Sequence, residues 1–324
     1  MTDRRQKLLL LDTASLYFRA FYGVPDSVTA PDGTPVNAVR GLMDFISRLV
    51  GEYEPTHLAC CWDNDWRPQW RVDLLPSYKT HRVVEEVETD PDVEEIPDPL
   101  SAQIPVIVDV LAAWGIPVVG ADGYEADDVI GTLATTYADP AGRSPMPVDV
   151  VTGDRDLFQL VTPEGTEPPV RVLYVARGVS KHDRVDESWL RAKYDVTGAQ
   201  YADFALMRGD ASDGLPGVAG VGEKTAATLL NRFGDLAGIR AAAEDPDASM
   251  APGVRRKVKD AADYLDVAPK VVAVARDIDL GDPDLELPAD GPAAPDRAAE
   301  LAERWGLGSA AERLSEVLGG PPAG

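Results

Sequence analysis

Aspartates follow three separate apolar runs of the sequence, each at the point where the run ends. They are Asp12, Asp63 and Asp154, which follow residues 8–11, 58–62 and 148–152, the last with Gly153 in between. Short apolar runs without alternation are typical of buried parallel strands, whose carboxyl ends meet at one edge of a sheet. A single aspartate after a strand is usually a turn former or a helix cap. Three of them at one edge indicate a shared site.

Six further carboxylates stand where they could join this group. Three open the helix that follows a weaker strand at 118–119, one lies two residues after Asp154, and two bound a tight turn after Gly209. Acids in the first turn of a helix are ordinary, because they complement the helix dipole. The apolar face of this helix must pack on the sheet, however, which brings its acids to the same edge. The candidate metal ligands are therefore Asp12, Asp63, Glu125, Asp127, Asp128, Asp154, Asp156, Asp210 and Asp213.

Such a carboxylate group predicts bound cations, because like charges at close range would otherwise force some members to protonate. Oxygen ligands without cysteine or histidine favour Mg²⁺ or Mn²⁺. The histidines His57, His81 and His182 show no zinc-ligand spacing. Cys60 and Cys61 are neighbours in an apolar run, and we expect them to be small buried hydrophobes on opposite faces of a strand. Two hard cations among carboxylates suit in-line displacement at a phosphodiester.

The net charge is -24, from 31 basic and 55 acidic residues. Proteins that bind nucleic-acid phosphates usually carry a basic surface, so this charge by itself argues against nucleic-acid binding. Part of this charge is the carboxylate group itself. Residues 83–100 add eight acidic residues and no basic one, and a solvated loop is the simplest interpretation of that run. No run approaches the roughly 18 apolar residues of a membrane span, and no signal peptide is evident. We expect a cytoplasmic protein without membrane association.

Strands and helices alternate in the first part of the chain, which predicts an α/β domain over residues 1–185. Its sheet is expected to be doubly wound and mostly parallel, with helices at 38–49, 102–113 and 127–137. Residues 186–324 are expected to form a helical second domain. Its predicted helices lie at 186–194, 199–207, 224–233, 254–262, 297–304 and 310–318.

A glycine-rich segment directly follows Asp213 and precedes the helix at 224–233. Gly217, Gly220 and Gly222 allow close approach of the backbone to a ligand, and Lys224 and Thr225 open the helix. The free amides at a helix N-terminus favour an anion. The segment is neither a dinucleotide fingerprint, since no strand precedes it, nor a phosphate loop of the GKT type, since Glu223 interrupts that order. A plain helix–loop–helix corner is the alternative.

These motifs together resemble the 5′ nuclease family, which comprises flap endonucleases and the 5′→3′ exonuclease domain of bacterial DNA polymerase I. The resemblance covers nearly the whole chain. It rests on Asp12 with Arg19, on Trp62-Asp63, on Tyr78-Lys79, on Tyr124 to Asp128 (YEADD), on Thr152 to Gln159 (TGDRDLFQ), and on Gly209 to Asp213 (GDASD) running into Gly222 to Ala226 (GEKTA).

The resemblance implies a PIN-like nuclease domain, an arch over residues 76–105, and a helix–three-turn–helix element at about 205–235 that binds the duplex backbone and often a K⁺ ion. It assigns a first group of metal ligands to Asp12, Asp63, Glu125, Asp127 and Asp128, and a second group to Asp154, Asp156, Asp210 and Asp213. It places Lys79 and Arg82 at the scissile phosphate with Arg19 nearby, and Lys224 at a phosphate of the duplex.

Two departures from the family pattern stand out. Gly214 occupies a position where the family more often has asparagine, and we expect this change to affect turn shape only. The acidic run 83–100 falls in the arch, where the family holds a 5′ single strand that carboxylates would repel. Basic residues at 255–259 and Lys270 could extend a positive stripe from Lys224, although a solvated helix face is an equal alternative.

The leading hypothesis is a flap endonuclease and 5′→3′ exonuclease that cleaves DNA with two or more Mg²⁺ or Mn²⁺ ions at 5′ flaps, nicks and duplex ends. Because the chain ends at residue 324, we expect a stand-alone, monomeric enzyme in the cytoplasm and at the nucleoid, coupled to DNA polymerase and ligase in primer removal and repair. The alternatives are a structure-specific DNA-binding protein without catalysis, a PIN-type ribonuclease and an acidic cation buffer.

Overall fold

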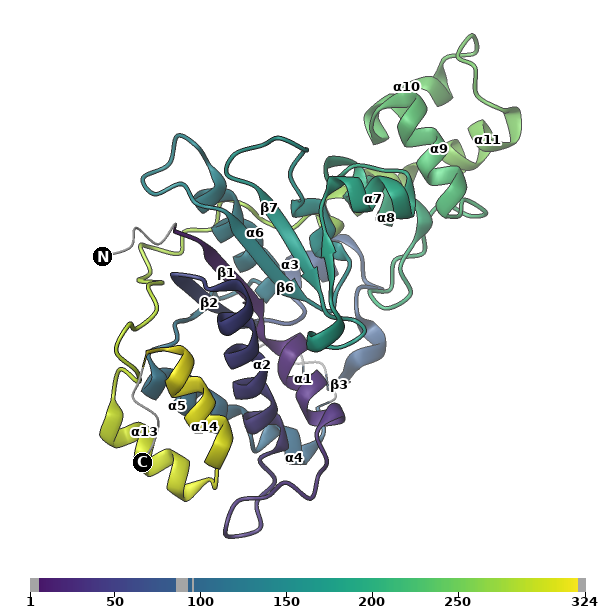
Figure 1. Ribbon diagram of the computed structural model, residues 1–324. Helices are drawn as coiled ribbons and strands as arrows, with labels where there is room; N and C mark the ends of the chain where they lie inside the picture. The colour runs from purple at the N-terminus through teal and green to yellow at the C-terminus, as the bar shows by residue number, and fades with distance from the viewer. Residues whose placement is uncertain (1–5, 86–92, 95, 320–324) are drawn as a thin grey trace.

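A six-stranded sheet lies at the centre of the computed structural model, which describes residues 6–85, 93–94 and 96–319 (Figure 1). Its order is β5-β2-β1-β6-β7-β8, and every pair is parallel except β7 with β8. The strands are β1 (Leu8–Asp12), β2 (His57–Trp62), β5 (Val118–Gly120), β6 (Val148–Thr152), β7 (Val170–Tyr174) and β8 (Asp183–Val185). The four predicted strands are confirmed. β7 and β8 were not predicted.

The central strands are buried on both faces, which explains why their sequences show no alternation. Leu8 and Leu10 pack into one hydrophobic cluster, and Leu9 and Leu11 pack into the other on the opposite face of the sheet. All four are fully buried. Cys60 and Cys61 divide in the same way between the two clusters and are both free, as predicted.

Helices cover both faces of the sheet in the first part of the chain. They are α1 (Thr13–Gly23), α2 (Asn37–Tyr53), α3 (Gln69–Leu74), α4 (Asp98–Ser101), α5 (Ile104–Trp114) and α6 (Ala126–Ala138). The apolar residues of α1, α2 and α5 pack on the face that carries Leu9, whereas those of α6 pack on the face that carries Leu8. The predicted helices therefore exist, and α1, α3 and α4 are additions.

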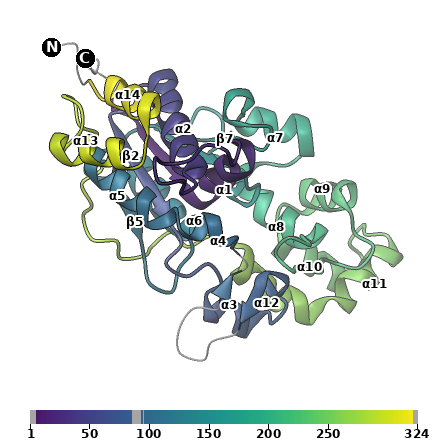
Figure 2. The same ribbon diagram turned by 90° about the horizontal axis from the view of Figure 1, so that it is seen from below.

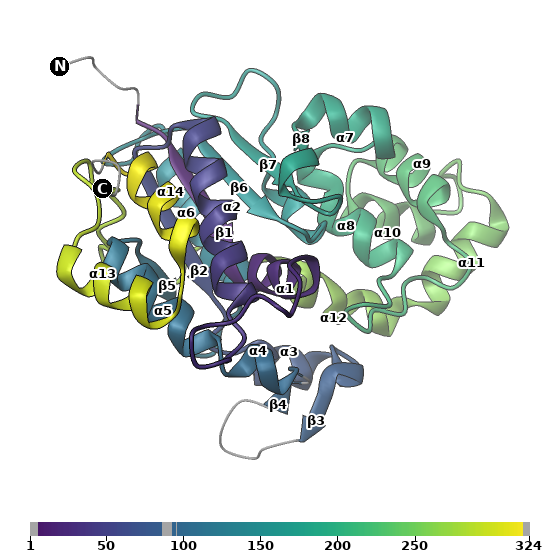
Figure 3. The same cartoon turned by 60° about the horizontal axis from the view of Figure 1, so that its bottom comes forward.

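The predicted arch segment begins with the 3-10 helix η1 (Thr80–Arg82) and a short antiparallel pair, β3 (Val83–Glu85) and β4 (Val93–Glu94). Figure 3 shows this pair beside α3 and α4. Most of the acidic run lies outside the described residues, namely Glu86, Glu88, Asp90, Asp92 and Glu95.

The second group of helices lies to one side of the sheet (Figure 1). It comprises α7 (Glu187–Tyr194), α8 (Gly198–Arg208), α9 (Glu223–Phe233), α10 (Leu236–Glu244), α11 (Pro252–Asp260) and α12 (Ala262–Val272). The aromatic ring of Phe158, in the 3-10 helix η2 (Asp156–Leu160), joins the two parts by edge contacts with Tyr201, Trp189 and Tyr174. Throughout the described ranges, no helix combines the length and apolar character needed to cross a bilayer.

The last two helices correct the predicted domain division. α13 (Pro295–Arg304) packs on α5, and α14 (Gly308–Val317) packs on α2, so both lie on the sheet domain rather than with α7–α12 (Figures 1 and 2). Leu301 and Leu314 belong to the same hydrophobic cluster as Leu9. The reason is that α2 and α5 present apolar side chains on their outer faces as well, which a further helical layer must cover.

Candidate active site

A cavity of about 510 Å³ opens at the carboxyl edge of the parallel strands. Six of the nine predicted carboxylates line it, together with both predicted phosphate-contacting cations. The lining residues include Asp12, Asp63, Glu125, Asp127, Asp154, Asp210, Lys79, Arg82 and Glu94. The prediction that three strands deliver aspartates to one edge is therefore confirmed. Asp156 and Asp213 lie directly behind this cavity, in a small recess that they share with Glu125 and Asp127.

Asp12 is held between the end of β1 and the start of α1. Its Oδ1 accepts a hydrogen bond from the Ser15 amide at 3.1 Å, so it caps the helix, and its Oδ2 accepts one from the Thr152 hydroxyl at 2.7 Å. The same Thr152 oxygen accepts a hydrogen bond from the Asp154 amide at 2.8 Å. These bonds fix two strand-end carboxylates relative to each other across β1 and β6.

The N-terminus of α6 brings a second set of carboxylates to the cavity. Asp63, directly after β2, accepts a hydrogen bond from the Ala126 amide at 2.8 Å. This bond uses a free amide of the first turn and positions an anion at the positive end of the helix dipole. Asp127 lies in the same first turn and lines the cavity.

Glu125 is a cavity carboxylate that three protein side chains hold in place. It is 3% exposed and accepts hydrogen bonds from the Tyr78 hydroxyl at 2.7 Å, from Arg71 at 3.1 Å and from the Lys79 ammonium. Three donors from one segment of chain hold this carboxylate in a single orientation. Tyr78 and Lys79, at the base of the predicted arch, therefore help to fix the first acidic residue of the motif YEADD.

The carboxylates of the second predicted group differ in environment. Asp210 accepts hydrogen bonds from Arg208 at 3.1 Å, from Arg155 at 3.3 Å and from the Ser212 amide at 2.9 Å. Burial tends to raise the pKa of Asp210, but the Ser212 bonds and the two guanidinium groups outweigh it and lower the pKa. Asp213 is 7% exposed and has Arg82 at 3.9 Å from its Oδ1. Asp210 is thus already neutralised by protein cations, whereas the other members largely are not.

Burial and mutual repulsion raise the pKa of five of the predicted ligands. Burial is the first cause at each, and neighbouring acidic groups add to it. The five are Asp12, whose pKa rises from 3.8 to about 7, and Asp63, Asp127, Asp156 and Asp213. Groups of this kind are stabilised in their charged form when a cation lies among them. The donor set therefore suits divalent ions that prefer oxygen ligands. Within residues 6–85, 93–94 and 96–319, no three potential ligands converge on one point, so the carboxylates surround the cavity.

We expect the metal-free protein to lose stability as the pH rises from 3.8 towards about 7, because in this interval folded Asp12 keeps a proton that the unfolded chain releases. A raised pKa in the folded state stabilises the protein below the unfolded pKa, and this contribution is lost as the pH passes the folded pKa. The loss should be on the order of a few kcal/mol. Melting temperatures in EDTA should fall over this interval, and excess Mg²⁺ should suppress the fall. Identical pH profiles with EDTA and with Mg²⁺ would contradict the assignment of the cavity to cations.

Asp128 is a correction to the predicted ligand set. It is fully buried and forms a two-point ion pair with Arg71, with both N–O distances at 2.7 Å. Its oxygens also accept hydrogen bonds from the Ala275 amide at 2.8 Å and the Glu125 amide at 3.2 Å. It lines neither the cavity nor the recess behind it, and it completes a capping box with Glu125 at the start of α6. We assign Asp128 to holding Arg71 and the helix end.

Replacement of Asp128 by Asn should therefore destabilise the protein by about 3–5 kcal/mol, because it leaves the Arg71 guanidinium buried without its main partner. Urea unfolding should show this loss. The control is Asp282→Asn, since Asp282 is exposed and pairs with Arg143 at 3.8 Å only. That variant should differ by less than about 0.5 kcal/mol. A stable Asp128→Asn protein with weakened Mg²⁺ binding would return Asp128 to the ligand set.

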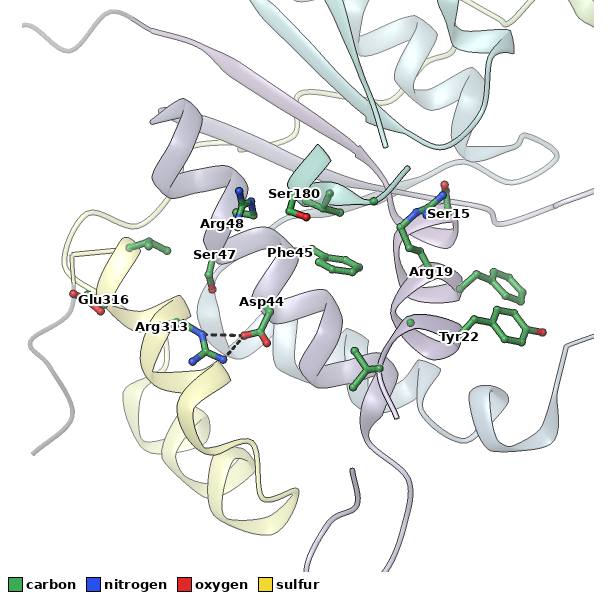
Figure 4. A pocket seen from close by; sticks show the side chains of 16 residues that line it. Ser15, Arg19, Tyr22, Asp44, Phe45, Ser47, Arg48, Ser180, Arg313 and Glu316 are labelled. Carbon is green, nitrogen blue, oxygen red and sulfur yellow. Dashed lines mark hydrogen bonds and ion pairs between the residues drawn. The ribbon is translucent and has the colours of Figure 1, made fainter. Parts of the chain in front are cut away.

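The predicted cations lie at different distances from the carboxylates. Lys79 and Arg82 line the carboxylate cavity, with Arg82 also 4.0 Å from Glu94. Arg19 donates to the Ala176 carbonyl at 3.2 Å and lines a neighbouring cavity of about 1260 Å³ between α1, α2 and α14. Figure 4 shows Arg19 beside Ser15 on α1, with Arg313 paired to Asp44 across this second cavity. Arg19 is thus adjacent to the site rather than within it.

The predicted glycine-rich segment lies between α8 and α9. Gly217 and Gly220 both have φ of +71°, and a side chain at Gly217 would meet the backbone of Arg208 and Gly209 within 3 Å. Gly222 caps α9, and Lys224 and Thr225 follow in its first turn. The helix–loop–helix arrangement is therefore present. Its nucleic-acid contacts remain a prediction.

The proposed positive stripe is weaker than the sequence indicated. Arg255 donates to the carbonyls of Ala242 and Ala243 at the end of α10, and Lys257 donates to the Gly220 carbonyl at 2.8 Å. Lys259 pairs with Glu244 at 2.8 Å. These three cations are already bound within the protein.

Sequence reasoning missed several residues that shape the site. Arg71 and Tyr78 hold Glu125, and Glu94 and Trp66 line the carboxylate cavity. The pKa of Glu94 is raised, first by burial, with Arg82 opposing the shift. Glu94 belongs to the acidic run 83–100, so at least this member faces the site. The sequence around Arg71 does not indicate a role for it, because its partners Glu125 and Asp128 come close to it only in the folded protein.

Comparison with known proteins identifies relatives along almost the whole chain. Residues 7–195 match the family model "5′-3′ exonuclease, N-terminal resolvase-like domain", and residues 196–293 match "5′-3′ exonuclease, C-terminal SAM fold". A 5′-3′ exonuclease of Streptomyces coelicolor is 59% identical over 310 residues, which are 96% of this chain and 99% of that protein. DNA polymerase I of Mycobacterium bovis is 41% identical over 78% of this chain and 25% of the polymerase.

The fold also has solved counterparts. One is a bacteriophage T5 flap endonuclease in a pseudo-enzyme-product complex with DNA and metal ions. It aligns with a TM-score of 0.62 at 14% identity, over 97% of this chain and 99% of that protein. At this identity the likeness concerns the fold, and it covers both the sheet and the helical part.

Proposed function

The chain is a nuclease of the 5′-3′ exonuclease family, and from that premise we propose that it is a divalent-metal-dependent flap endonuclease and 5′→3′ exonuclease acting on DNA. The observation that carries the proposal is the convergence of strand-end and helix-end carboxylates on one cavity, with Lys79 and Arg82 in its wall. The T5 relative of the same fold is named as a flap endonuclease in complex with DNA and metal ions.

Mg²⁺ or Mn²⁺ ions, two or more in number, would supply Lewis acidity and an activated water for phosphodiester hydrolysis. Asp12, Asp63, Glu125 and Asp127 fit a first group of ligands, because they surround the part of the cavity at β1, β2 and α6. Asp154, Asp156, Asp210 and Asp213 fit a second group, nearer to the helical part. In this group Asp210 would be shared with Arg155 and Arg208.

The protein cations complement these ligands. Lys79 donates to Glu125 and to the Trp66 carbonyl, which leaves its ammonium at the cavity wall. An ammonium there would stabilise the negative charge that develops on phosphate oxygens during cleavage. Arg82 is about one-third exposed and would add a second, more mobile contact. Tyr78 and Arg71 would keep Glu125 oriented while Lys79 binds the phosphate.

The segment from Gly217 to Thr225 would bind the phosphate backbone of the duplex through the N-terminus of α9, with a K⁺ ion at the loop carbonyls and Lys224 at a phosphate. This places the duplex on the helical part and the scissile bond at the sheet edge. We infer that a monomer suffices, that the protein works in the cytoplasm, and that a DNA polymerase and a ligase act on the same strand during primer removal and repair.

The test is a cleavage map on a double-flap DNA substrate labelled at either end. With Mg²⁺, products should end within a nucleotide or two of the junction of the 5′ flap, and excess EDTA should abolish them. An RNA flap of the same sequence separates DNA from RNA preference. Full activity in EDTA would exclude the metal mechanism, and binding without cleavage in either Mg²⁺ or Mn²⁺ would favour a structure-specific binding protein.

A further inference from the structure

The base of the arch rests on the loop that carries Asp210 and Asp213. The Ser77 hydroxyl donates to the Gly214 carbonyl at 2.8 Å, and the Lys79 amide donates to the Asp213 carbonyl at 3.1 Å. The Arg82 guanidinium donates to the Ser212 carbonyl at 3.4 Å. Three hydrogen bonds thus join the segment with both phosphate-contacting cations to the loop with two carboxylates of the second group.

Gly214 lies at the centre of this contact. Its φ is +71°, and a Cβ added there would stand 2.0 Å from the Ser77 carbonyl oxygen and 2.8 Å from the Ser77 carbonyl carbon. Such distances to backbone atoms cannot be accommodated unless one of the two segments moves. The position therefore requires glycine for two reasons, its backbone conformation and the space taken by Ser77. The sequence expectation that Gly214 affects turn shape only is incomplete.

The conformation of Lys79 depends on the same contact. Lys79 has φ of +49°, a left-handed conformation that residues other than glycine adopt rarely and that persists when the surroundings enforce it. Its amide is the donor to Asp213, and the Cβ position of Gly214 lies 3.4 Å from its nitrogen. A shift of the loop would thus rotate or displace the residue whose ammonium lines the cavity.

We propose that Gly214 is a positioning residue for the cleavage step: its lack of a side chain seats the loop 212–214 against Ser77 and thereby sets the Lys79 ammonium relative to Asp213. This inference rests on the role proposed above for Lys79. The position couples the two parts of the chain, because Lys79 belongs to the sheet domain and Gly214 to the segment after α8. A misplacement of about 1 Å in such a group can cost on the order of 100-fold in rate.

A double-mutant cycle tests the proposal. Gly214→Ala, Lys79→Ala and the combined variant are compared with the parent by the single-turnover cleavage rate on saturating 5′-flap DNA with Mg²⁺. Affinity for DNA is measured in Ca²⁺. We expect Gly214→Ala to lower the rate by roughly 30- to 100-fold and to leave DNA affinity within about threefold. In the Lys79→Ala background, Gly214→Ala should alter the cleavage rate by less than about threefold. The reason is that the effects of two substitutions do not add when one residue acts through the other.

The matched control is Gly281→Ala. Gly281 has φ of +66°, and an added Cβ there would meet no atom within 4 Å, so the substitution brings the same kind of backbone strain without the contact. It should leave the cleavage rate unchanged. Ser77→Ala is a milder probe in case Gly214→Ala does not fold: it removes only the bond to Gly214 and should lower the rate by about threefold or more, again only when Lys79 is present.

Three outcomes would overturn the proposal. A full cleavage rate for Gly214→Ala would show that the contact is unimportant. An undiminished effect in the Lys79→Ala background would show that Gly214 acts through the carboxylates or the fold instead. A parent-like rate for Lys79→Ala alone would refute the role of Lys79 itself, and this result is separable from the other two because it requires no change at Gly214.

Discussion

Asp154→Asn is expected to abolish cleavage, with a loss on the order of 1000-fold or more in the single-turnover rate. Asp154 lines the carboxylate cavity, and its Oδ1 accepts a hydrogen bond from the Asp156 amide at 3.0 Å. The amide of Asn keeps the shape but removes the charge that a divalent cation requires, and several kcal/mol of charge stabilisation correspond to a loss of this size. Asp156→Asn should behave in the same way. Cleavage of a 5′-flap substrate with Mg²⁺ measures both.

The same variants should retain their fold and measurable DNA binding. Burial and the neighbouring Asp154 and Asp213 raise the pKa of Asp156, so neutralising Asp154 relieves repulsion in the metal-free protein. Asp154→Asn should therefore melt in EDTA at a temperature no lower than that of the parent. Asp122→Asn is the control, because Asp122 is exposed and accepts a hydrogen bond from Asn64 at 2.8 Å, away from the proposed second group of ligands. An active Asp154→Asn protein would exclude the proposed second group of ligands.

Lys79→Ala is expected to lower the cleavage rate at saturating DNA by about 100- to 1000-fold, the usual range for loss of one electrostatic donor at a developing charge. The ammonium of Lys79 is in direct contact with Glu125, and it lines the cavity. The decrease should persist at high Mg²⁺ concentration, because the ammonium acts on the phosphate rather than on the affinity for the ion. Rates measured over a Mg²⁺ titration distinguish the two effects.

Lys193→Ala is the matched control for this change. Lys193 is exposed on α7, where its ammonium lies 5.6 Å from the ring centre of Trp189, away from the carboxylate cavity. Its removal takes away the same charge from the chain without touching the site. If excess Mg²⁺ returned the cleavage rate of Lys79→Ala to that of the parent, Lys79 would serve only to hold Glu125 for the ion.

The convergence of the carboxylates could be predicted from the sequence because they have fixed places relative to regular elements. A parallel sheet brings the ends of β1, β2 and β6 together whatever the loops do, so Asp12, Asp63 and Asp154 meet by necessity. Asp128 shows the limit of such reasoning. Its position in α6 is compatible with the cavity, and only the three-dimensional placement of Arg71 from α3 shows that its oxygens are occupied.

The strands and helices could be predicted where the apolar runs are long. They could not be predicted where an element depends on packing partners that are distant in the sequence. β7 and β8 were missed because Val170–Tyr174 includes Arg171, which is accommodated by its ion pair with Asp149 in the adjacent strand at 3.0 Å. The placement of α13 and α14 on α5 and α2 depends on which apolar face remains uncovered after the sheet has formed. That information lies in the packing and not in either segment alone.

Because α13 and α14 pack on the sheet domain, the folding of this domain depends on helices that are synthesised late. Leu314 completes the hydrophobic cluster that contains Leu9, so the layer around the first strand is unfinished until the last helix has been synthesised. A nascent chain that has reached Asp213 already carries every carboxylate of the site but lacks the helices that stabilise the sheet beneath them. Cutting activity on DNA should therefore appear only after α14 has been synthesised and has packed on α2.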